Sequence, residues 1–494
     1  MFNFFSGSSD FTDIIERGAQ TSITEKQFFE REIAKWKRSP SRRAMITGER
    51  YYLGDHDILN RRRTIIGKDG LLQEVNNLPN SKIVDNQYAK MVDQKVNYLL
   101  GKPLTFNTDN AVYAKALRKI FGKRFQRTLK NLGEDALNGG IAWLYPYYDD
   151  AGELSFKKFA PYEILPFWKD AEHTVLDCAL RLYEVQAYEG LEEKIIEKVE
   201  IYRNDGIGRY ILVNGTLVHD MENPSGTYMT TVDKNGIETG LNWAKIPLIA
   251  FKYNNKETPL IKRVKSLQDG INAILSDFQN NMQEDARNTI LVIKNYDGTN
   301  LAEFRHNLAT YGAVKVKTAD GADGGVETLS VSVNAENYKA ILDLFKKAVV
   351  ENARGFDAKD DRLNGSPNEM NIRSMYSDID LDANGMETEF QTAFEELLWF
   401  ADVYLANSGT GNFEDEEIEI IFNRNVLINE SETIDNCAKS AGIISEETII
   451  AQHPWTTDVK KELERLNKEK EPADEYKGAF GAVNNSDGGD GNET

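Results

Sequence analysis

One short segment of the chain has the residue types and the spacing to bind a cation. In Asp380-Leu-Asp382-Ala-Asn384-Gly385, three oxygen-bearing side chains alternate with other residues and a glycine follows. The first half of a calcium-binding EF-hand loop has this arrangement, because alternate oxygens and a sharp glycine turn surround the ion. The twelfth loop position is Gln391, which lacks the bidentate carboxylate that completes such a site. The alternative, a polar interruption of a long helix, fits the segment better, and no metal site is predicted.

No other segment contains the residues of a catalytic motif. Each Gly-Lys pair lacks the upstream glycine of a phosphate-binding loop, and neither G-x-S-x-G nor H-E-x-x-H occurs. The five histidines are scattered one to a region, which is typical of structural or surface residues. The only cysteines, Cys178 and Cys437, predict neither a disulfide framework nor a thiolate metal site. The sequence thus predicts no enzyme, no catalytic residue and no cofactor; a Ca²⁺-dependent hydrolase built on Asp380, Asp382 and Asn384 remains an alternative.

The charge of the chain is negative and unevenly distributed. The 494 residues carry 59 Lys and Arg against 79 Asp and Glu, a net charge of −20. Residues 25–63 hold eleven basic against six acidic side chains, whereas residues 414–475 hold seven against seventeen. Sequence-independent DNA binding depends on neutralising phosphates, so the chain as a whole is not predicted to grip DNA. No run of about 18 apolar residues and no signal peptide is present, which predicts a protein of a cytosol without membrane contact.

The elements around the Asp380 segment predict a stalk. Apolar residues recur every three or four positions over 266–288 and 335–354, which predicts two amphipathic helices separated by a compact, strand-containing insert. We call these two helices and their insert the stalk, because two helices that leave a body and return carry the insert at their far end. A third helix is predicted over 372–407, with Gly385 expected to bend or interrupt it. The predicted apolar stripes are Leu267, Ile271, Ile274, Leu275, Phe278 and Met282 on the first helix, and Tyr338, Ile341, Leu342, Phe345 and Val349 on the second.

Shorter elements are predicted on both sides of the stalk. Short alternating runs with Asn-Gly turns over 141–260 predict antiparallel sheet. An acidic strand is predicted over 416–422 and a small helical region over 431–467. The Gly-, Asn- and Asp-rich end predicts a disordered tail from 472. Further helices are expected at 26–43, 86–101 and 125–138.

Several segments, taken in order, resemble one protein family. They are NQYAK at 86–90, NYLLGKPLTF at 97–106, IPLIAFKYNN at 246–255, LQDGINAILSD at 267–277 and SAGIISEETI at 440–449. Over residues 25–470 the chain resembles the portal (head-to-tail connector) proteins of tailed bacteriophages, of the type common in long-tailed phages of Gram-positive bacteria. These segments have no catalytic content.

The resemblance implies an α+β, helix-dominated portal fold, in which antiparallel wing sheets accompany a two-helix stem, a β-containing clip, a long spine helix and a helical crown. The regions implied are a flexible N-terminus at 1–24, a wing at 25–260, stem helices at 261–288 and 334–355 around the clip at 289–333, a channel loop at 356–371, the spine helix at 372–410, a wing strand at 411–430, the crown at 431–471 and a disordered tail at 472–494.

The resemblance also implies a function. Such proteins form a homo-oligomeric ring, usually of twelve copies, at one capsid vertex of the virion, assembled in the cytoplasm of the bacterial host. The ring is the conduit for double-stranded DNA during packaging and ejection. Its implied partners are the terminase large subunit, a head-completion or adaptor protein, and the major capsid and scaffolding proteins. The alternative is another virion ring or adaptor protein, whose subunits are normally far shorter.

Two residue sets follow from the resemblance. Residues implied to line the DNA channel are Lys339, Lys346, Lys347, Lys359, Arg362, Asn364 and Asn368. Residues implied to contact partners at the clip are Lys294, Arg305, Lys315 and Lys317.

Overall fold

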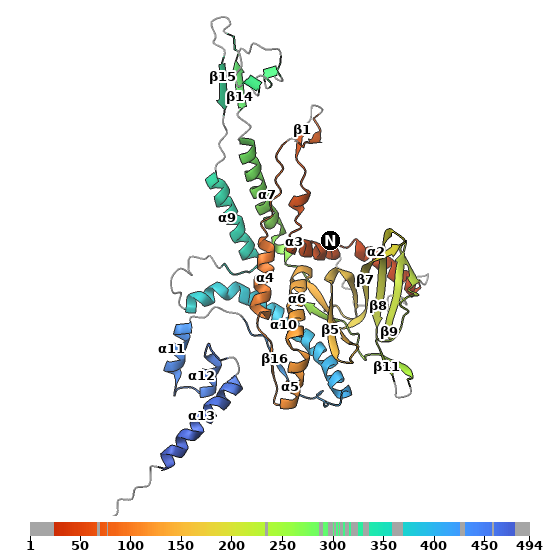
Figure 1. The fold of residues 1–494 in the computed structure, drawn as a ribbon, viewed down its shortest axis with the longest axis vertical. Coiled ribbons are helices and arrows are strands. Elements are labelled where there is room, and N and C mark those ends of the chain that lie inside the picture. The colour runs from red at the N-terminus through yellow and green to blue at the C-terminus, as the bar shows by residue number, and fades with distance from the viewer. Residues whose placement is uncertain are drawn as a thin grey trace, which may run out of the picture. The chain divides into compact units, whose positions relative to one another are not determined.

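The computed structural model describes most of the chain. The described residues are 24–66, 70–76, 78–232, 236–285, 290–294, 325–329, 335–357, 369–424, 430–456 and 459–479, with isolated positions between 300 and 317. The chain divides into two compact units (Figure 1). The first comprises Met1–Phe356 and Asp378–Asn425, and the second comprises Asp357–Ser377 and Val426–Thr494. The predicted flexible segment 1–24 lies almost wholly outside the described residues.

Two antiparallel sheets form much of the first unit and confirm the sheet predicted over 141–260. Asn214 and Gly215 both have positive φ, as a two-residue turn of the predicted Asn-Gly type requires. The larger sheet has the order β10-β9-β8-β7-β6, built from β6 (Ile164–Trp168), β7 (Leu176–Glu189), β8 (Glu192–Arg203), β9 (Gly206–Val213) and β10 (Thr216–His219). The smaller has the order β13-β4-β5, built from β4 (Ile141–Tyr148), β5 (Leu154–Phe159) and β13 (Ile249–Lys252).

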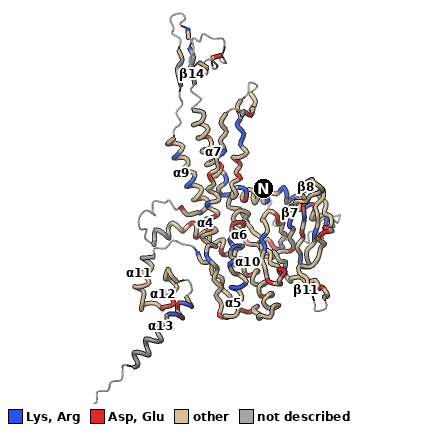
Figure 2. The backbone as a smooth tube through the Cα atoms, viewed as in Figure 1, with Lys and Arg blue, Asp and Glu red and all other residues tan. Residues whose placement is uncertain are grey.

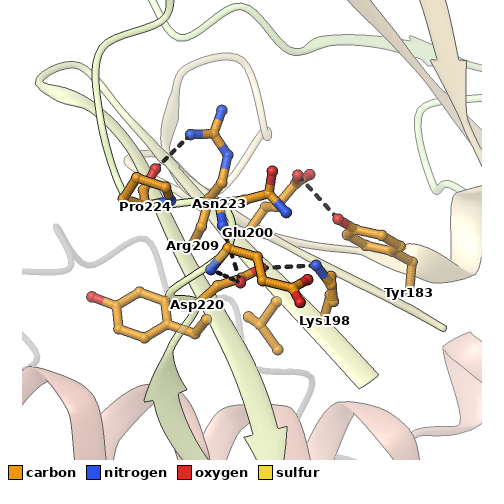
Figure 3. A pocket seen from close by; sticks show the side chains of 10 residues that line it. Tyr183, Lys198, Glu200, Arg209, Asp220, Asn223 and Pro224 are labelled. Atoms are coloured by element: carbon orange, nitrogen blue, oxygen red, sulfur yellow. Dashed lines mark hydrogen bonds and ion pairs between the residues drawn. The ribbon is translucent and has the colours of Figure 1, made fainter. Parts of the chain in front are cut away.

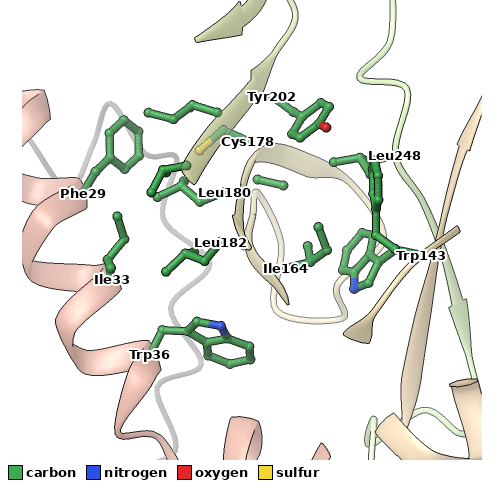
Figure 4. Close-up of a cluster of buried hydrophobic side chains, with 14 of the residues drawn as sticks. Phe29, Ile33, Trp36, Trp143, Ile164, Cys178, Leu180, Leu182, Tyr202 and Leu248 are labelled. Atoms are coloured by element: carbon green, nitrogen blue, oxygen red, sulfur yellow. The ribbon is translucent and has the colours of Figure 1, made fainter. Parts of the chain in front are cut away.

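A hydrophobic core joins helix α2 (Glu25–Lys37) to both sheets. Phe29, Ile33 and Trp36 of α2 point toward Leu180 and Leu182 of β7 (Figure 4). These apolar residues, at helical spacing, form the buried face of α2. The helix predicted over 26–43 is, however, two helices, because Pro40 cannot continue α2 and instead begins α3 (Pro40–Tyr52), whose first turn is capped by the Ser39 hydroxyl.

The first unit contains further helices and strands. The predicted helix 86–101 is confirmed as α4 (Gln87–Leu100), capped by Asn86, and the predicted helix 125–138 as α6 (Lys123–Gly139). The others are α5 (Ala111–Ile120) and the short 3₁₀ turns η1 (Asp57–Asn60) and η2 (Pro161–Glu163). Three two-stranded sheets pair β1 (Thr64–Ile66) with β2 (Leu72–Glu74), β11 (Met229–Val232) with β12 (Glu238–Leu241), and β16 (Glu419–Ile421) with β3 (Thr105–Asn107).

The stalk of the first unit consists of α7 (Ile261–Asp285), α9 (Ala335–Asn352) and an intervening strand pair, β14 (Ile290–Lys294) with β15 (Gly325–Leu329). Figure 1 shows the strand pair at the far ends of the two helices. The helices pack through Phe278 against Tyr338, with ring centroids 5.1 Å apart. β14 and β15 confirm that the insert contains strands, and most of residues 295–324 lie outside the described part of the chain.

The long third helix is α10 (Glu369–Asn407). It confirms the helix predicted over 372–407. The helix continues through Gly385, whose missing side chain faces open space, so the interruption expected at Asn384-Gly385 is wrong. The bend, the other outcome expected there, stays a prediction.

The second unit is helical after residue 430. It contains α11 (Glu430–Ser440), α12 (Glu446–Gln452), capped by Ser445, and α13 (Val459–Ala479), in addition to the start of α10. The helical region predicted over 431–467 is therefore confirmed. α13 continues to Ala479, so residues 472–479, which were assigned to a disordered tail, are helical in the structure.

A column of polar side chains on α7 holds an extended segment of the chain. Gln268, Asn272, Ser276 and Asn280 follow one another at four-residue intervals, and all four are completely buried. Each accepts a hydrogen bond from a backbone N–H of the segment 81–88. The pairs are Tyr88 with Gln268 at 2.9 Å, Asp85 with Asn272 at 3.0 Å, Ile83 with Ser276 at 2.9 Å and Ser81 with Asn280 at 2.7 Å. We call these four side chains the polar ladder.

The polar ladder also positions a buried histidine. Asn272 Nδ2 donates to His56 Nδ1 at 2.7 Å, and His56 Nε2 donates to the Tyr51 carbonyl at 3.0 Å. Burial lowers the pKa of His56, so the ring stays neutral and can accept the Asn272 hydrogen bond. The polar ladder is buried because it supplies the acceptors that a neighbouring strand would give residues 81–86 and that the first turn of α4 lacks.

Substituting Asn272 tests the polar ladder. Asn272→Leu leaves the Asp85 N–H and the His56 ring nitrogen without partners, so we expect a loss of about 2 kcal/mol or more in the free energy of unfolding. Urea unfolding followed by circular dichroism measures this loss. Gln279→Leu, on an exposed position of the same helix, is the matched control. Equal stability of the two variants would show that the ladder contributes nothing.

Candidate functional site

The carboxylate of Asp382 lies where the stalk joins the body of the first unit. Lys95 Nζ of α4 lies 2.7 Å from Asp382 Oδ2, and Tyr253 Oη, next to β13, donates to the same oxygen at 2.6 Å. Arg263 Nη1 of α7 donates to Asp382 Oδ1 at 3.0 Å, and Arg354, after α9, approaches within 4.0 Å. One α10 side chain thus contacts α4, the residue after β13, and both helices of the stalk at its base.

The electrostatics of this cluster favour an ionised Asp382. Burial of Asp382 opposes its ionisation, but Lys95, Tyr253 and Arg263 more than offset this cost, and the pKa of Asp382 is lowered. Lys95 is only 4% exposed, and its ammonium also donates to the Arg354 carbonyl at 3.0 Å. A buried ion pair of this kind is costly to break, because either charge alone would be left in an apolar surrounding.

The three oxygen-bearing side chains singled out as a possible calcium loop do not converge. They lie on a continuous helix, where residues two apart point to nearly opposite sides. Asp380 and Asn384 face Arg424, with Arg424 Nη1 2.8 Å from Asp380 Oδ1, while Asp382 faces Lys95 on the other side. Across the described residues, no group of three or more His, Cys, Asp or Glu is placed to hold a metal ion.

The stalk lysines predicted to line a channel do not share one face. Lys346 lies 2.7 Å from Asp85, so its charge is already paired beside the polar ladder. Lys339, seven residues earlier and on the same side of α9, is exposed and has no ion pair with any residue the structure describes. Lys347 is largely exposed and lies 4.0 Å from Glu351, about 100° around the helix from Lys346.

Most of the other predicted site residues fall outside the described part of the chain. This applies to Lys359, Arg362, Asn364 and Asn368 of the loop and to Arg305 and Lys315 of the insert. Lys294, at the end of β14, and Lys317 are described and exposed.

The beginning of the predicted channel loop is held in place by Gln94. Phe356 is buried, and its N–H and carbonyl both bond to the Gln94 side chain, at 2.8 and 2.7 Å.

A cavity of about 530 Å³ opens on the five-stranded sheet (Figure 3). Its charged walls are already paired, with Lys198 2.8 Å from Asp220 and Arg209 donating to the Pro224 carbonyl at 2.9 Å. Glu200 accepts from Tyr183 at 3.3 Å. The hydrogen bond from Lys198 lowers the pKa of Asp220. Each charged group labelled in Figure 3 therefore already has a partner within the chain, and none of them is left to bind a ligand.

Comparison with known proteins identifies the family. Residues 34–476 match the family described as phage portal protein, SPP1 Gp6-like. The chain belongs to this family. It is 28% identical to the portal protein of Bacillus phage SPP1 over 452 residues, which are 90% of this chain and 87% of that protein. It is 26% identical over 448 residues to the portal protein of Clostridium phage phiCD119, covering 86% of this chain and 92% of that protein.

Among solved structures, a chain described as the neck of an empty GTA particle computed with C6 symmetry is similar over 74% of this chain and 88% of its own length. The TM-score is 0.43 and the identity 11%, a likeness too low to support a structural argument. The family match itself confirms the resemblance inferred from the sequence segments. It makes the chain a phage portal protein by family, and the mixed architecture of helices and antiparallel sheets agrees with the fold predicted for a portal protein.

Sequence reasoning missed what joins the stalk of this portal protein to its body. Lys95, Arg263 and Asp382 are far apart in the chain, and only Asp382 had been considered, as a cation ligand. Asp380 and Asp382 form ion pairs with four basic side chains, Lys95, Arg263, Arg354 and Arg424, and accept hydrogen bonds from Tyr98 and Tyr253.

No helix among the described residues is long and apolar enough to cross a membrane.

Replacing Asp382 tests the role of this cluster. Asp382→Asn leaves the buried Lys95 ammonium without a counter-charge, and we expect a loss of about 3 kcal/mol in the free energy of unfolding, measured in urea. The double variant Lys95→Met with Asp382→Leu removes both charges and should recover part of this loss. Asp378→Asn, exposed on the same helix, is the control. Additive losses in the double variant would contradict a direct pairing.

Proposed function

We propose that this chain is the subunit of a ring of about twelve copies at one vertex of a phage capsid, and that double-stranded DNA passes through the ring. The observation that carries the proposal is the stalk of α7 and α9 in a chain of the portal protein family. α7 has 25 residues, which corresponds to about 37 Å of helix. Copies of this helix pair arranged side by side would form the wall of a channel.

The regions of the chain take the following roles in this proposal. Residues 25–260 form the wing, together with the strand region 411–430. The stalk is the stem, with its helices at 261–288 and 334–355 and the clip at 289–333 at its far end. Residues 356–371 form the channel loop, 372–410 the spine helix and 431–471 the crown.

The charge of the protein suits a passage better than a binding site. With a net charge of −20 per copy, most of the ring repels DNA. Lys and Arg are interspersed with Asp and Glu along the described chain (Figure 2). The proposed contacts with DNA are few and weak. On the stalk they come from Lys339, Lys346 and Lys347, and the charge of Lys346 is already offset by Asp85. In the loop they come from Lys359, Arg362, Asn364 and Asn368.

The far end of the stalk is the proposed docking site for partners. The terminase large subunit would bind there during packaging and a head-completion or adaptor protein afterwards, through Lys294, Arg305, Lys315 and Lys317. The major capsid and scaffolding proteins would surround the wing. The ring would assemble in the cytoplasm of the bacterial host and remain in the virion, without membrane contact and without enzymatic activity or a cofactor of its own. A shorter adaptor ring is the rival function, and the match over residues 34–476 favours the portal.

The mass of the assembled particle tests the ring. Native mass spectrometry of the purified chain should show closed species of about a dozen subunits, and negative-stain images should show a central hole. Raising the protein concentration should increase the ring fraction, because assembly follows mass action. A chain that remains monomeric at all concentrations would contradict the proposed function.

The channel loop is tested separately from the ring. Replacing residues 358–368 with a Gly/Ser linker of equal length preserves the buried Phe356 and the start of α10. We expect rings of unchanged mass but a loss of packaged DNA, measured as DNA protected from nuclease in particles assembled with the variant. A linker of the same composition in the β11–β12 turn, at 233–237, is the control. Wild-type packaging by the loop variant would exclude a role for the loop.

A further inference from the structure

The chain leaves the stalk through a turn that closes α9. Arg354 has a left-handed backbone, with a φ of 52°, although it is not a glycine. The Gly355 N–H donates to the Val350 carbonyl at 2.8 Å, and the Arg354 N–H donates to the Glu351 carbonyl at 3.1 Å. These two bonds are typical of the turn that ends a helix, so the residues that follow take a direction of their own.

Helix α4 holds the backbone directly after this turn. The Phe356 N–H donates to Gln94 Oε1 at 2.8 Å, and Gln94 Nε2 donates to the Phe356 carbonyl at 2.7 Å. One amide side chain thus bonds to both backbone groups of one residue, and we call this pair of hydrogen bonds the Gln94 clamp. Lys95, the next residue of α4, donates from Nζ to the Arg354 carbonyl at 3.0 Å.

The close approach of this turn to α4 depends on Gly355. A Cβ at this position would lie 2.6 Å from Met91 Sδ and 3.0 Å from Gln94 Oε1. A larger residue would therefore have to displace the Met91 side chain or the Gln94 amide. The Phe356 side chain is only 7% exposed, and Figure 1 shows the end of α9 beside α4. The backbone of residues 354–356 is consequently held by α4 as well as by α9.

The Gln94 clamp lies at the boundary between the two compact units. The first unit ends at Phe356, which is also the first residue of the predicted channel loop. α4 is itself joined to the other stalk helix, because the Tyr88 N–H donates to Gln268 of α7 at 2.9 Å. Hydrogen bonds are directional, so a residue held at both its N–H and its carbonyl has a defined position and a defined orientation. The clamp therefore sets where the loop begins relative to both helices of the stalk.

We infer that Gln94 is a positioning residue for the passage of DNA, because it fixes the point and the direction from which the channel loop starts. The inference rests on the proposed function and adds a side chain outside the loop on which the loop depends. An amide suits this role, since its one acceptor and its donor group match the carbonyl and the N–H of a single residue. A carboxylate could only accept, and it would repel the Phe356 carbonyl.

Hydrogen–deuterium exchange of the full-length chain tests the clamp itself. Gln94→Met keeps the length and the helix propensity of the side chain but removes both hydrogen bonds. The Phe356 amide should exchange about tenfold faster, because it loses its acceptor. Gln126→Met is the matched control, since Gln126 Nε2 also bonds to the backbone, at the Leu100 and Lys102 carbonyls, both at 3.1 Å. This control should leave the exchange of the Phe356 amide unchanged.

Packaging tests the positioning role. Each variant is assembled into particles, and the DNA protected from nuclease is measured per ring. We expect Gln94→Met rings of wild-type mass with a loss of protected DNA that approaches the loss in the 358–368 linker variant. Gln126→Met should lower the melting temperature to a similar extent, since it too removes hydrogen bonds to the backbone, but it should package DNA as wild type does. A role of Gln94 in stability alone would change the melting temperature and leave the packaged DNA unchanged.

Each outcome decides between the inference and the proposed function. Unchanged exchange at Phe356, normal packaging by Gln94→Met, or equal packaging losses in the two glutamine variants overturns the inference. The proposed role of the loop stands in all three cases if the linker variant fails to package DNA. Wild-type packaging by the linker variant excludes a role for the loop and the inference with it.

Loss of rings separates two further cases. If Gln94→Met and Gln94→Ala both fail to form rings while Gln126→Met forms them, Gln94 supports assembly and the inference is overturned. If the unaltered chain forms no rings at any concentration, the proposed function is overturned together with the inference.

Discussion

The ion pair between Asp382 and Lys95 is the contact on which the arrangement of the first unit depends. Through the same carboxylate, α10 also contacts Arg263 at the start of α7, Arg354 after the end of α9 and Tyr253 beside β13. A long helix pair acts as a lever on its base, so the start of α7 and the end of α9 both need a fixed attachment there. Directional, charge-assisted hydrogen bonds supply a defined geometry that apolar packing alone does not. For a proposed channel subunit, this attachment determines where the stalk stands relative to the sheets.

The polar ladder serves the same purpose along the side of α7. Residues 81–86 pair with no strand that the structure describes, and the first turn of α4 has backbone N–H groups without partners inside the helix, so burying both without acceptors would be costly. Gln268, Asn272, Ser276 and Asn280 provide the missing acceptors at intervals of about 6 Å along the helix, close to the spacing of every second residue in an extended chain. α7 is consequently joined to the body by hydrogen bonds over about half its length.

The comparison of sequence and structure separates local from non-local information. The helices α2, α4 and α6 were predicted close to their observed positions because helical periodicity is a property of neighbouring residues. The helix predicted across Pro40 and the interruption predicted at Gly385 were wrong for opposite reasons. A proline always removes a backbone donor, whereas a glycine costs a helix only about 1 kcal/mol, which the buried residues on both sides of Gly385 in α10 readily offset.

The sequence by itself determined the family, the order of the elements and the existence of a stalk, because periodicity, turn residues and family segments are all written in contiguous stretches of chain. Only the tertiary structure decided what the polar residues of the stalk do. Asp382 could not be distinguished from a cation ligand, nor Asn272 from a solvated side chain, until Lys95 and the segment 81–88 were placed beside them. A charged or amide side chain looks the same in the sequence whether water or a buried partner forms its hydrogen bonds. Which of the two does so depends on residues up to almost three hundred positions away.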